Sequence, residues 1–147
     1  MPQSIRDVMT PAPRVLDARS TVQDAANAML DDDIGDDIDD DIGDVIVRDG
    51  AIVCGIVTDR DIAVRAIARG KDPGATQLGD ICSKDLAPLT SGDSVDDSVR
   101  LMREKAVRRI PVLEDGRPVG VVSIGDLAID RDRESALADI SRAPANT

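Results

Sequence analysis

The feature that most constrains the fold is an internal repeat. Residues 16–30 (LDARSTVQDAANAML) align with residues 89–103 (LTSGDSVDDSVRLMR). Further along, residues 55–64 (GIVTDRDIAV) align with residues 120–129 (GVVSIGDLAI). A chain of 147 residues that repeats one pattern in this way is built from two copies of one small structural unit. Because one such unit alone is marginally stable, the two copies are expected to fold together.

Each repeat predicts the order strand, helix, strand, strand, helix. Thr21 and Ser94 are typical N-cap residues, and apolar residues follow each of them at helical spacing. An Asp-Gly pair in each repeat indicates a turn between two short strands rich in Val and Ile. We therefore expect an α+β fold of two tandem β-α-β-β-α motifs related by pseudo-twofold symmetry. The expected boundaries are 5–70 for the first motif, 77–132 for the second, and 133–147 for a C-terminal tail.

An acidic segment interrupts the first repeat. Residues 31–38 (DDDIGDDI) and 39–46 (DDDIGDVI) are identical at seven of eight positions, which we interpret as a tandem duplication. Nine aspartates between residues 31 and 44 supply most of the net charge of −11. We expect a solvated surface loop or a lengthened helix end, since such insertions cost little. The alternative is a calcium or magnesium site, with the candidate ligands Asp31, Asp33, Asp37, Asp39 and Asp41.

The composition excludes several functions. There is no His, so Ser-His-Asp catalysis, Cys-His catalysis and imidazole metal sites are excluded. There is no Phe, Trp or Tyr on which nucleic-acid bases could stack, and the net negative charge opposes binding to nucleic acid or anionic membranes. We expect that the protein is not an enzyme.

No signal peptide or membrane span is present, so we expect a cytoplasmic protein. Cys54 and Cys82 are interpreted as buried small hydrophobic residues.

One motif occurs at the same place in both repeats. The sequence Gly-hydrophobic-hydrophobic-Thr/Ser-x-x-Asp spans residues 55–61 and 120–126. It places a hydroxyl at a strand-to-helix corner, with a carboxylate one helical turn further on. One interpretation is a helix cap, in which hydroxyl and carboxylate satisfy backbone N–H groups. The other is a nucleotide site, because a helix N-terminus attracts phosphate and a carboxylate can accept hydrogen bonds from a ribose diol.

With these corners, the sequence resembles a pair of cystathionine β-synthase (CBS) domains, also called a Bateman module. Residues 8–11 (VMTP), 58–62 (TDRDI) and 107–112 (VRRIPV) support the resemblance, which covers about residues 5–130. It implies a small stand-alone bacterial CBS-domain protein, a non-catalytic regulatory or sensor module. Such modules commonly bind AMP, ADP, ATP or S-adenosylmethionine in two clefts, and none of these is an obligatory cofactor. The resemblance also implies a homodimer and a downstream protein partner.

The resemblance implies a role for particular residues. Asp61 and Asp126 would hold ribose hydroxyls, while Thr58 and Ser123 would face ribose or phosphate. The base would be held by Val45, Ile46, Ile110 and Pro111, and Thr10 and Ser83 would line the clefts. Candidate phosphate partners, chosen because Arg binds phosphate bidentately, are Arg60, Arg108, Arg109, Lys84 and Arg14. Arg60 lies inside the first corner, where the second has Gly125, so we expect the first corner to suit a phosphorylated ligand better.

A second hypothesis belongs to another class of function. The chain would be a protein-interaction or assembly module without a small ligand, and its two corners would only cap helices. Under this hypothesis, loss of Asp61 or Asp126 costs about 0.5–2 kcal/mol of stability and has no effect on ligand binding.

Overall fold

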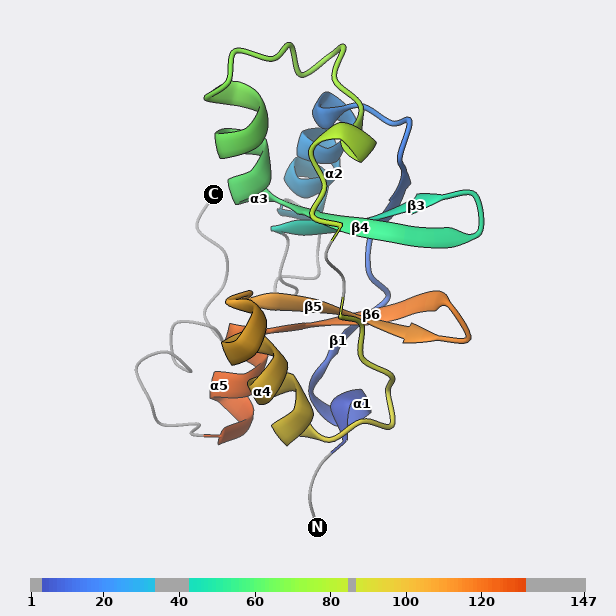
Figure 1. The fold of residues 1–147 in the computed structure, drawn as a ribbon, viewed down its shortest axis with the longest axis vertical. Coiled ribbons are helices and arrows are strands. Elements are labelled where there is room, and N and C mark those ends of the chain that lie inside the picture. The colour runs from blue at the N-terminus through green and yellow to red at the C-terminus, as the bar shows by residue number, and fades with distance from the viewer. Residues whose placement is uncertain (1–3, 34–42, 85–86, 132–147) are drawn as a thin grey trace. The chain divides into compact units, whose positions relative to one another are not determined.

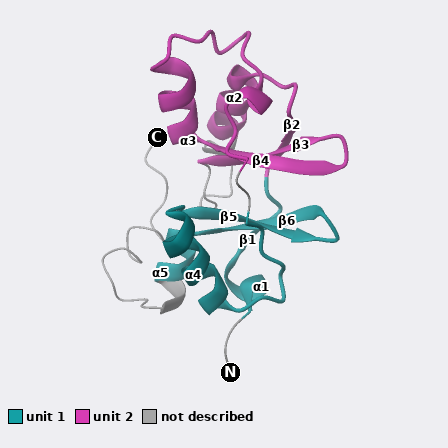
Figure 2. Ribbon diagram, viewed as in Figure 1, with its two compact units in different colours: residues 1–13, 87–146 teal, residues 14–86, 147 magenta. Residues whose placement is uncertain are grey.

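A computed structural model of the chain describes residues 4–33, 43–84 and 87–131. The fold is α+β, as expected, and the chain divides into two compact units (Figure 2). Among the described residues, unit 1 contains 4–13 and 87–131, and unit 2 contains 14–33 and 43–84.

Unit 2 is a three-stranded sheet covered by helices. Its sheet has the order β2-β3-β4, with β2 parallel to β3 and β3 antiparallel to β4 (Figure 2). The expected second helix begins as α3 and continues directly into the π-helical element η1, a departure that the sequence pattern does not predict. The elements are β2 (Val15–Asp17), α2 (Val22–Asp33), β3 (Asp44–Asp49), β4 (Ile52–Thr58), α3 (Asp59–Asp61), η1 (Ile62–Ile67) and the 3-10 helix η2 (Leu78–Asp80).

Unit 1 is also a three-stranded sheet with helices, but it differs in how its strands pair. Its sheet has the order β1-β6-β5, and both pairings are antiparallel (Figure 1). The expected strand at Pro88-Leu89 is reduced to one parallel bridge between Leu89 and Val112. The elements are α1 (Ile5–Val8), β1 (Thr10–Pro11), α4 (Val95–Lys105), β5 (Arg109–Glu114), β6 (Arg117–Ser123) and α5 (Ile124–Arg131).

Two short linker segments, residues 4–11 and 77–84, bind corresponding places in the two units. In unit 2, the N–H groups of Leu78 and Gly79 donate to the carbonyls of Ser20 and Ala18, at 2.8 and 2.9 Å. In unit 1, the linker segment 4–11 makes the equivalent pair of bonds, at 2.8 and 3.0 Å. The first linker segment therefore packs with the second repeat. For this reason, the compact units differ from the sequence repeats expected at 5–70 and 77–132.

The glycine of each corner motif makes room for a linker segment. A Cβ on Gly120 would lie 2.6 Å from Met9 Sδ and 2.9 Å from the Thr10 carbonyl oxygen. A Cβ on Gly55 would lie 2.6 Å from the Ser83 carbonyl oxygen and 2.7 Å from Cys82 Sγ. These distances are shorter than van der Waals contact, so any side chain at either position would push the linker segment away from the sheet.

Each unit has its own aliphatic core, as the lack of aromatic residues requires. The cores lie between one face of each sheet and its helices, and they include Val45 and Val57 in unit 2 and Ile110 and Val122 in unit 1. Side chains alternate along a strand, so the neighbouring residues of these four point to the opposite face of each sheet. The two corners lie at the ends of β4 and β6.

Candidate functional site

The corner of unit 1 brings Thr10, Ser123 and Asp126 together. The N–H of Ser123 donates to Asp126 Oδ2 at 2.9 Å, and Ser123 Oγ accepts from the Asp126 N–H at 3.1 Å. Thr10 lies on β1, which pairs with β6 with Thr10 opposite Val121. From there its hydroxyl donates to both Asp126 carboxylate oxygens, at 3.4 Å each. Thr10 and Asp126 are far apart in the sequence, and the pairing of the linker segment with β6 brings them into contact.

The corner of unit 2 has the same cap with different surroundings. The N–H and the hydroxyl of Thr58 donate to Asp61 Oδ2 at 2.9 and 3.1 Å, and Thr58 Oγ1 accepts from the Asp61 N–H at 3.2 Å. Ser83 holds the place of Thr10, because it pairs with Ile56 through two backbone hydrogen bonds. The other carboxylate oxygen, Asp61 Oδ1, forms an ion pair with Arg65 Nε at 3.5 Å.

Sequence reasoning did not identify Arg65 as part of this corner. Its guanidinium also donates to the carbonyl of Ile81 at 3.3 Å, so it connects Asp61 to the second linker segment. The four-residue spacing from Asp61 to Arg65, which allows an ion pair along one helix face, is the signal that could have found it.

The sheet registers decide which candidates share a face with the corner hydroxyls. Ile46 lies opposite Ile56, and Pro111 lies opposite Val121, on the same sheet faces as Thr58 and Ser123. Val45 and Ile110 point the other way, into the cores, where their side chains are 0% and 2% exposed. Of the four residues expected to hold a base through backbone and aliphatic contacts, Val45 and Ile110 therefore present only their backbone on the face of the corner hydroxyls, because neighbours in a strand point to opposite faces.

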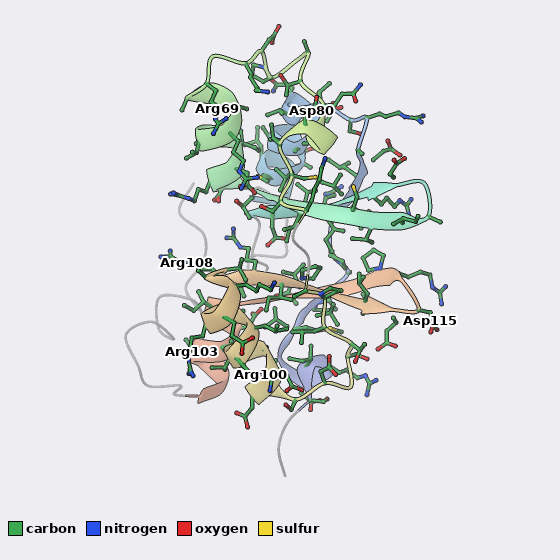
Figure 3. All side chains as sticks on the ribbon, viewed as in Figure 1. Arg69, Asp80, Arg100, Arg103, Arg108 and Asp115 are labelled. Atoms are coloured by element: carbon green, nitrogen blue, oxygen red, sulfur yellow. The ribbon has the colours of Figure 1, made fainter. Side chains whose placement is uncertain are left out.

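The residues paired with the two corner hydroxyls have opposite charges. Asp44 lies opposite Thr58 in unit 2, whereas Arg109 lies opposite Ser123 in unit 1. The preceding residues correspond as well, because the carbonyls of Gly43 and Arg108 both accept the first N–H of the helix after the corner, at 3.0 and 2.9 Å. Arg108 is labelled in Figure 3, in unit 1.

The cations of the corner in unit 1 therefore come from β5 and the residue before it. Asp44 was not among the sequence candidates, because it was counted only as part of the acidic segment. In unit 1 the residue paired with the corner hydroxyl is therefore a cation, which the expectation from Arg60 alone did not take into account.

The remaining candidates are three cations and the aspartates of the acidic segment. Arg60 and Lys84 are exposed, and Arg14 is exposed while its carbonyl accepts from the Ile46 N–H at 2.9 Å. Asp31 and Asp33 lie at the end of α2, and Asp37, Asp39 and Asp41 lie outside the described residues. Among the described residues, no group of three or more potential metal ligands is present. None of the described helices is long and apolar enough to cross a membrane.

The Thr/Ser-x-x-Asp cap also occurs away from the corners. Thr21 with Asp24 and Ser94 with Asp97 form the same reciprocal hydrogen bonds at the starts of α2 and α4. One residue of each corner is buried, since Asp61 and Ser123 are only 9% and 7% exposed. Their partners Thr58 and Asp126 are half-buried, and the caps away from the corners contain only half-buried or exposed residues. Capping alone does not require that burial.

Fold and corners together define a class of protein, a tandem α+β repeat module. The sequence pattern of the CBS domain matches residues 5–67 and 78–129. The CBS domain-containing protein YhcV of Bacillus subtilis is 32% identical over 142 residues, which is 94% of this chain and 95% of that protein. Hypoxic response protein 1 of Mycobacterium tuberculosis is 30% identical over 123 residues, which is 84% of this chain and 81% of that protein. The chain therefore belongs to the CBS domain family and carries a CBS pair. CBS-domain proteins are generally regulatory and not catalytic.

Solved structures share the fold. The crystal structure of hypoxic response protein I with two coordinated zinc ions matches with a TM-score of 0.71 and 27% identity, covering 87% of this chain and 98% of that one. The CBS domain pair of protein MJ0100, in complex with 5′-methylthioadenosine and S-adenosyl-L-methionine, matches with a TM-score of 0.73 and 21% identity. That alignment covers 87% of this chain and 94% of the other, and it shows a common fold.

Proposed function

We propose that this CBS pair is a non-catalytic sensor that binds an adenosine-containing ligand at its Thr/Ser-x-x-Asp corners. The observation that carries the proposal is the duplicated corner, in which a half-buried or buried hydroxyl and a carboxylate lie at the start of a helix. In unit 1 the carboxylate also accepts from Thr10 of the linker segment. The complex of the MJ0100 CBS pair with two adenosyl compounds supports this ligand class. AMP, ADP, ATP and S-adenosylmethionine are the candidates.

The corner of unit 1 is the better ribose site. Its Asp126 carboxylate accepts the Ser123 N–H at 2.9 Å and the Thr10 hydroxyl at 3.4 Å. The Thr10 contact is near the outer limit of a hydrogen bond, so ribose hydroxyls can replace it at little cost. In unit 2, the Asp61 carboxylate already has two shorter hydrogen bonds on one oxygen and an ion pair on the other.

The charges next to the hydroxyls suggest which ligand each corner prefers. Arg108 and Arg109 supply two cations at the corner of unit 1, which suits the phosphate of AMP, ADP or ATP. At the corner of unit 2, the buried Asp44 repels phosphate and favours an uncharged or cationic adenosyl group, such as the sulfonium of S-adenosylmethionine.

Isothermal titration calorimetry with AMP, ADP, ATP and S-adenosylmethionine tests the proposal. We expect a saturable heat with a phosphorylated ligand, and a loss of affinity of about 10-fold or more for AMP in Arg109→Ala, with a smaller change for adenosine. No heat with any of the four ligands at millimolar concentration would contradict the proposal.

The second candidate is an interaction or assembly module without a small ligand. It is favoured by one observation, which is that both corners are complete capping boxes as they stand. It predicts ordinary capping losses in Asp61→Ala and Asp126→Ala and no ligand effect. A homodimer and a cytoplasmic location remain predictions under either function.

A further inference from the structure

Unit 2 holds both cysteines of the chain in one place. Cys54 lies on β4 and Cys82 on the second linker segment, and both pack in the same apolar cluster. The register of β3 and β4 shifts between Val47 and Arg48, so Cys54 is an extra residue in its strand. This bulge lets the Cys54 side chain join the core face beside Gly55, and its thiol donates to the Val47 carbonyl at 3.4 Å.

The Cys82 thiol approaches the same point from the other side. Its Sγ would lie 2.7 Å from a Cβ on Gly55, the residue next to Cys54. Burial, and then the nearby Cys54, raise the pKa of the Cys82 thiol, so it stays protonated at neutral pH. Both cysteines are in the free thiol form.

In unit 1, residues without thiol groups occupy the positions that correspond to Cys54 and Cys82. A register shift between Val112 and Leu113 makes Val119 the extra residue of β6, at the place of Cys54. Met9 takes the place of Cys82, since its Sδ would lie 2.6 Å from a Cβ on Gly120. Val119 and Met9 pack against the core of unit 1. The fold therefore requires only apolar side chains here, and the thiol pair is particular to unit 2.

We propose that Cys54 and Cys82 form a reversible disulfide that fastens the second linker segment to β4. The oxidant is a low-molecular-weight disulfide such as oxidised glutathione. Cys54 is the attacking thiol because it is half-buried, whereas Cys82 is only 5% exposed. Its thiolate attacks one glutathione sulfur, which forms a mixed disulfide and releases one glutathione thiolate. Cys82 then loses its proton to that thiolate or to water and attacks the Cys54 sulfur. The protein disulfide forms, and the second glutathione leaves.

The disulfide would act beside the corner of unit 2. Cys82 lies between Ile81, whose carbonyl accepts from Arg65, and Ser83, which pairs with Ile56. Arg65 in turn holds Asp61 of the corner. Oxidation would therefore lock the segment that supports this corner, and the corner of unit 1 would have no equivalent lock. The proposal does not depend on the ligand.

Incubation of the folded chain with excess oxidised glutathione tests the disulfide. We expect the thiols titrated after denaturation to fall from two to none, with a peptide map that joins the Cys54 and Cys82 peptides. The oxidised chain should remain a single polypeptide in mass, its melting temperature should rise by about 5 °C or more, and dithiothreitol should reverse both changes.

The matched control variants place the corresponding residues of unit 1 at the two cysteine positions. Cys54→Val reproduces Val119 and Cys82→Met reproduces Met9, so packing is retained while the pair is lost. Each variant should keep one thiol or accept one glutathione, with no rise in melting temperature. The proposal is overturned if the wild-type thiols stay unreacted, end as two separate glutathione adducts, or join different chains. The wild-type measurement decides the question even if a variant fails to fold.

Discussion

Gly55 and Gly120 show how one residue type can fix a distant contact. Each lies on the strand before its corner, and each leaves space where a linker segment crosses the sheet. In unit 1, that crossing brings Thr10 to Asp126. The glycine of the motif is therefore part of the site even though it has no side chain.

A methyl group at Gly120 should be costly. Its Cβ would be 2.6 Å from Met9 Sδ and 2.9 Å from the Thr10 carbonyl oxygen, which is backbone and cannot rotate away. We expect Gly120→Ala to lower the free energy of unfolding by about 1–3 kcal/mol in urea denaturation. Gly92→Ala is the control, because nothing lies within 4 Å of its Cβ position. Equal stability of the two variants would show that the linker segment is not held as described.

At this scale the sequence predicts the corners better than their surroundings. The hydroxyl and carboxylate pairs follow from local spacing, because a cap is formed within four residues. The pairing of Asp44 with Thr58 and of Arg109 with Ser123 depends on the sheet register, which local spacing does not specify. The same register separates Val45 from Ile46 as possible contacts of a ligand.

Among the elements, the first linker segment is attached by a polar network as well as by backbone pairing. Arg6, next to the start of α1, donates to Ser91 Oγ at 3.0 Å. The Ser91 backbone N–H donates to Glu114 Oε1 at 3.1 Å, and the Ser91 hydroxyl donates to the same oxygen. These three residues connect α1, the start of the second repeat and the end of β5.

This network predicts a dependence of stability on pH. The hydrogen bonds from the side chain and the backbone of Ser91 lower the pKa of Glu114 from its ordinary value of 4.5. A lowered pKa in the folded state adds stability above the unfolded value, and this contribution is lost as the pH falls through the folded value. We expect wild type to be more stable than Glu114→Gln at neutral pH. This difference in stability should shrink as the pH falls through 4.5 and below.

Urea denaturation midpoints measured across that pH range check the prediction. Asp115→Asn is the control, because it removes a nearby exposed carboxylate. A difference that stays constant with pH would count against the network.

Elements with strong local signals were predicted well, and those decided by tertiary packing were not. The helices opened by Thr21 and Ser94 and the two hairpins follow from caps, turns and apolar spacing. The π-helical turns of η1 and the loss of a full strand at Leu89 have no such local signal. The packing of the first linker segment with the second repeat depends on contacts between residues far apart in the sequence, such as Arg6 and Ser91, which are 85 positions apart.

On the scale of the whole molecule, several of the described apolar residues that stay exposed lie on helices, although the most exposed of them, Ile52 at 72%, lies on β4. Val64 and Ile67 on η1 are 43% and 54% exposed, and Ile124 on α5 is 46% exposed. The homodimer is expected from family precedent and from the large apolar sheet faces, and the strand residues Ile46 and Val121 on those faces are already buried in the single chain. Exposed helix residues are therefore the better basis for self-association.

We expect the chain to be a homodimer in light scattering, with a mass twice the 15.6 kDa of one chain. Ile67→Glu should shift it toward monomer, because a charge in an apolar interface is costly to bury. Lys71→Glu, a charge change at an exposed position just beyond η1, is the control. A wild-type chain that is monomeric at all concentrations would refute this prediction.

The most direct test of the central claim compares two variants that lose the same kind of cap. Asp126→Ala and Asp97→Ala each remove the acid of a Ser-x-x-Asp capping box, at a cost of about 0.5–2 kcal/mol in stability. Only Asp126 lies at a corner. Calorimetric titration with AMP should show binding to wild type and to Asp97→Ala, and a loss of at least about 10-fold in affinity in Asp126→Ala. Equal AMP affinity in both variants would contradict the proposed site.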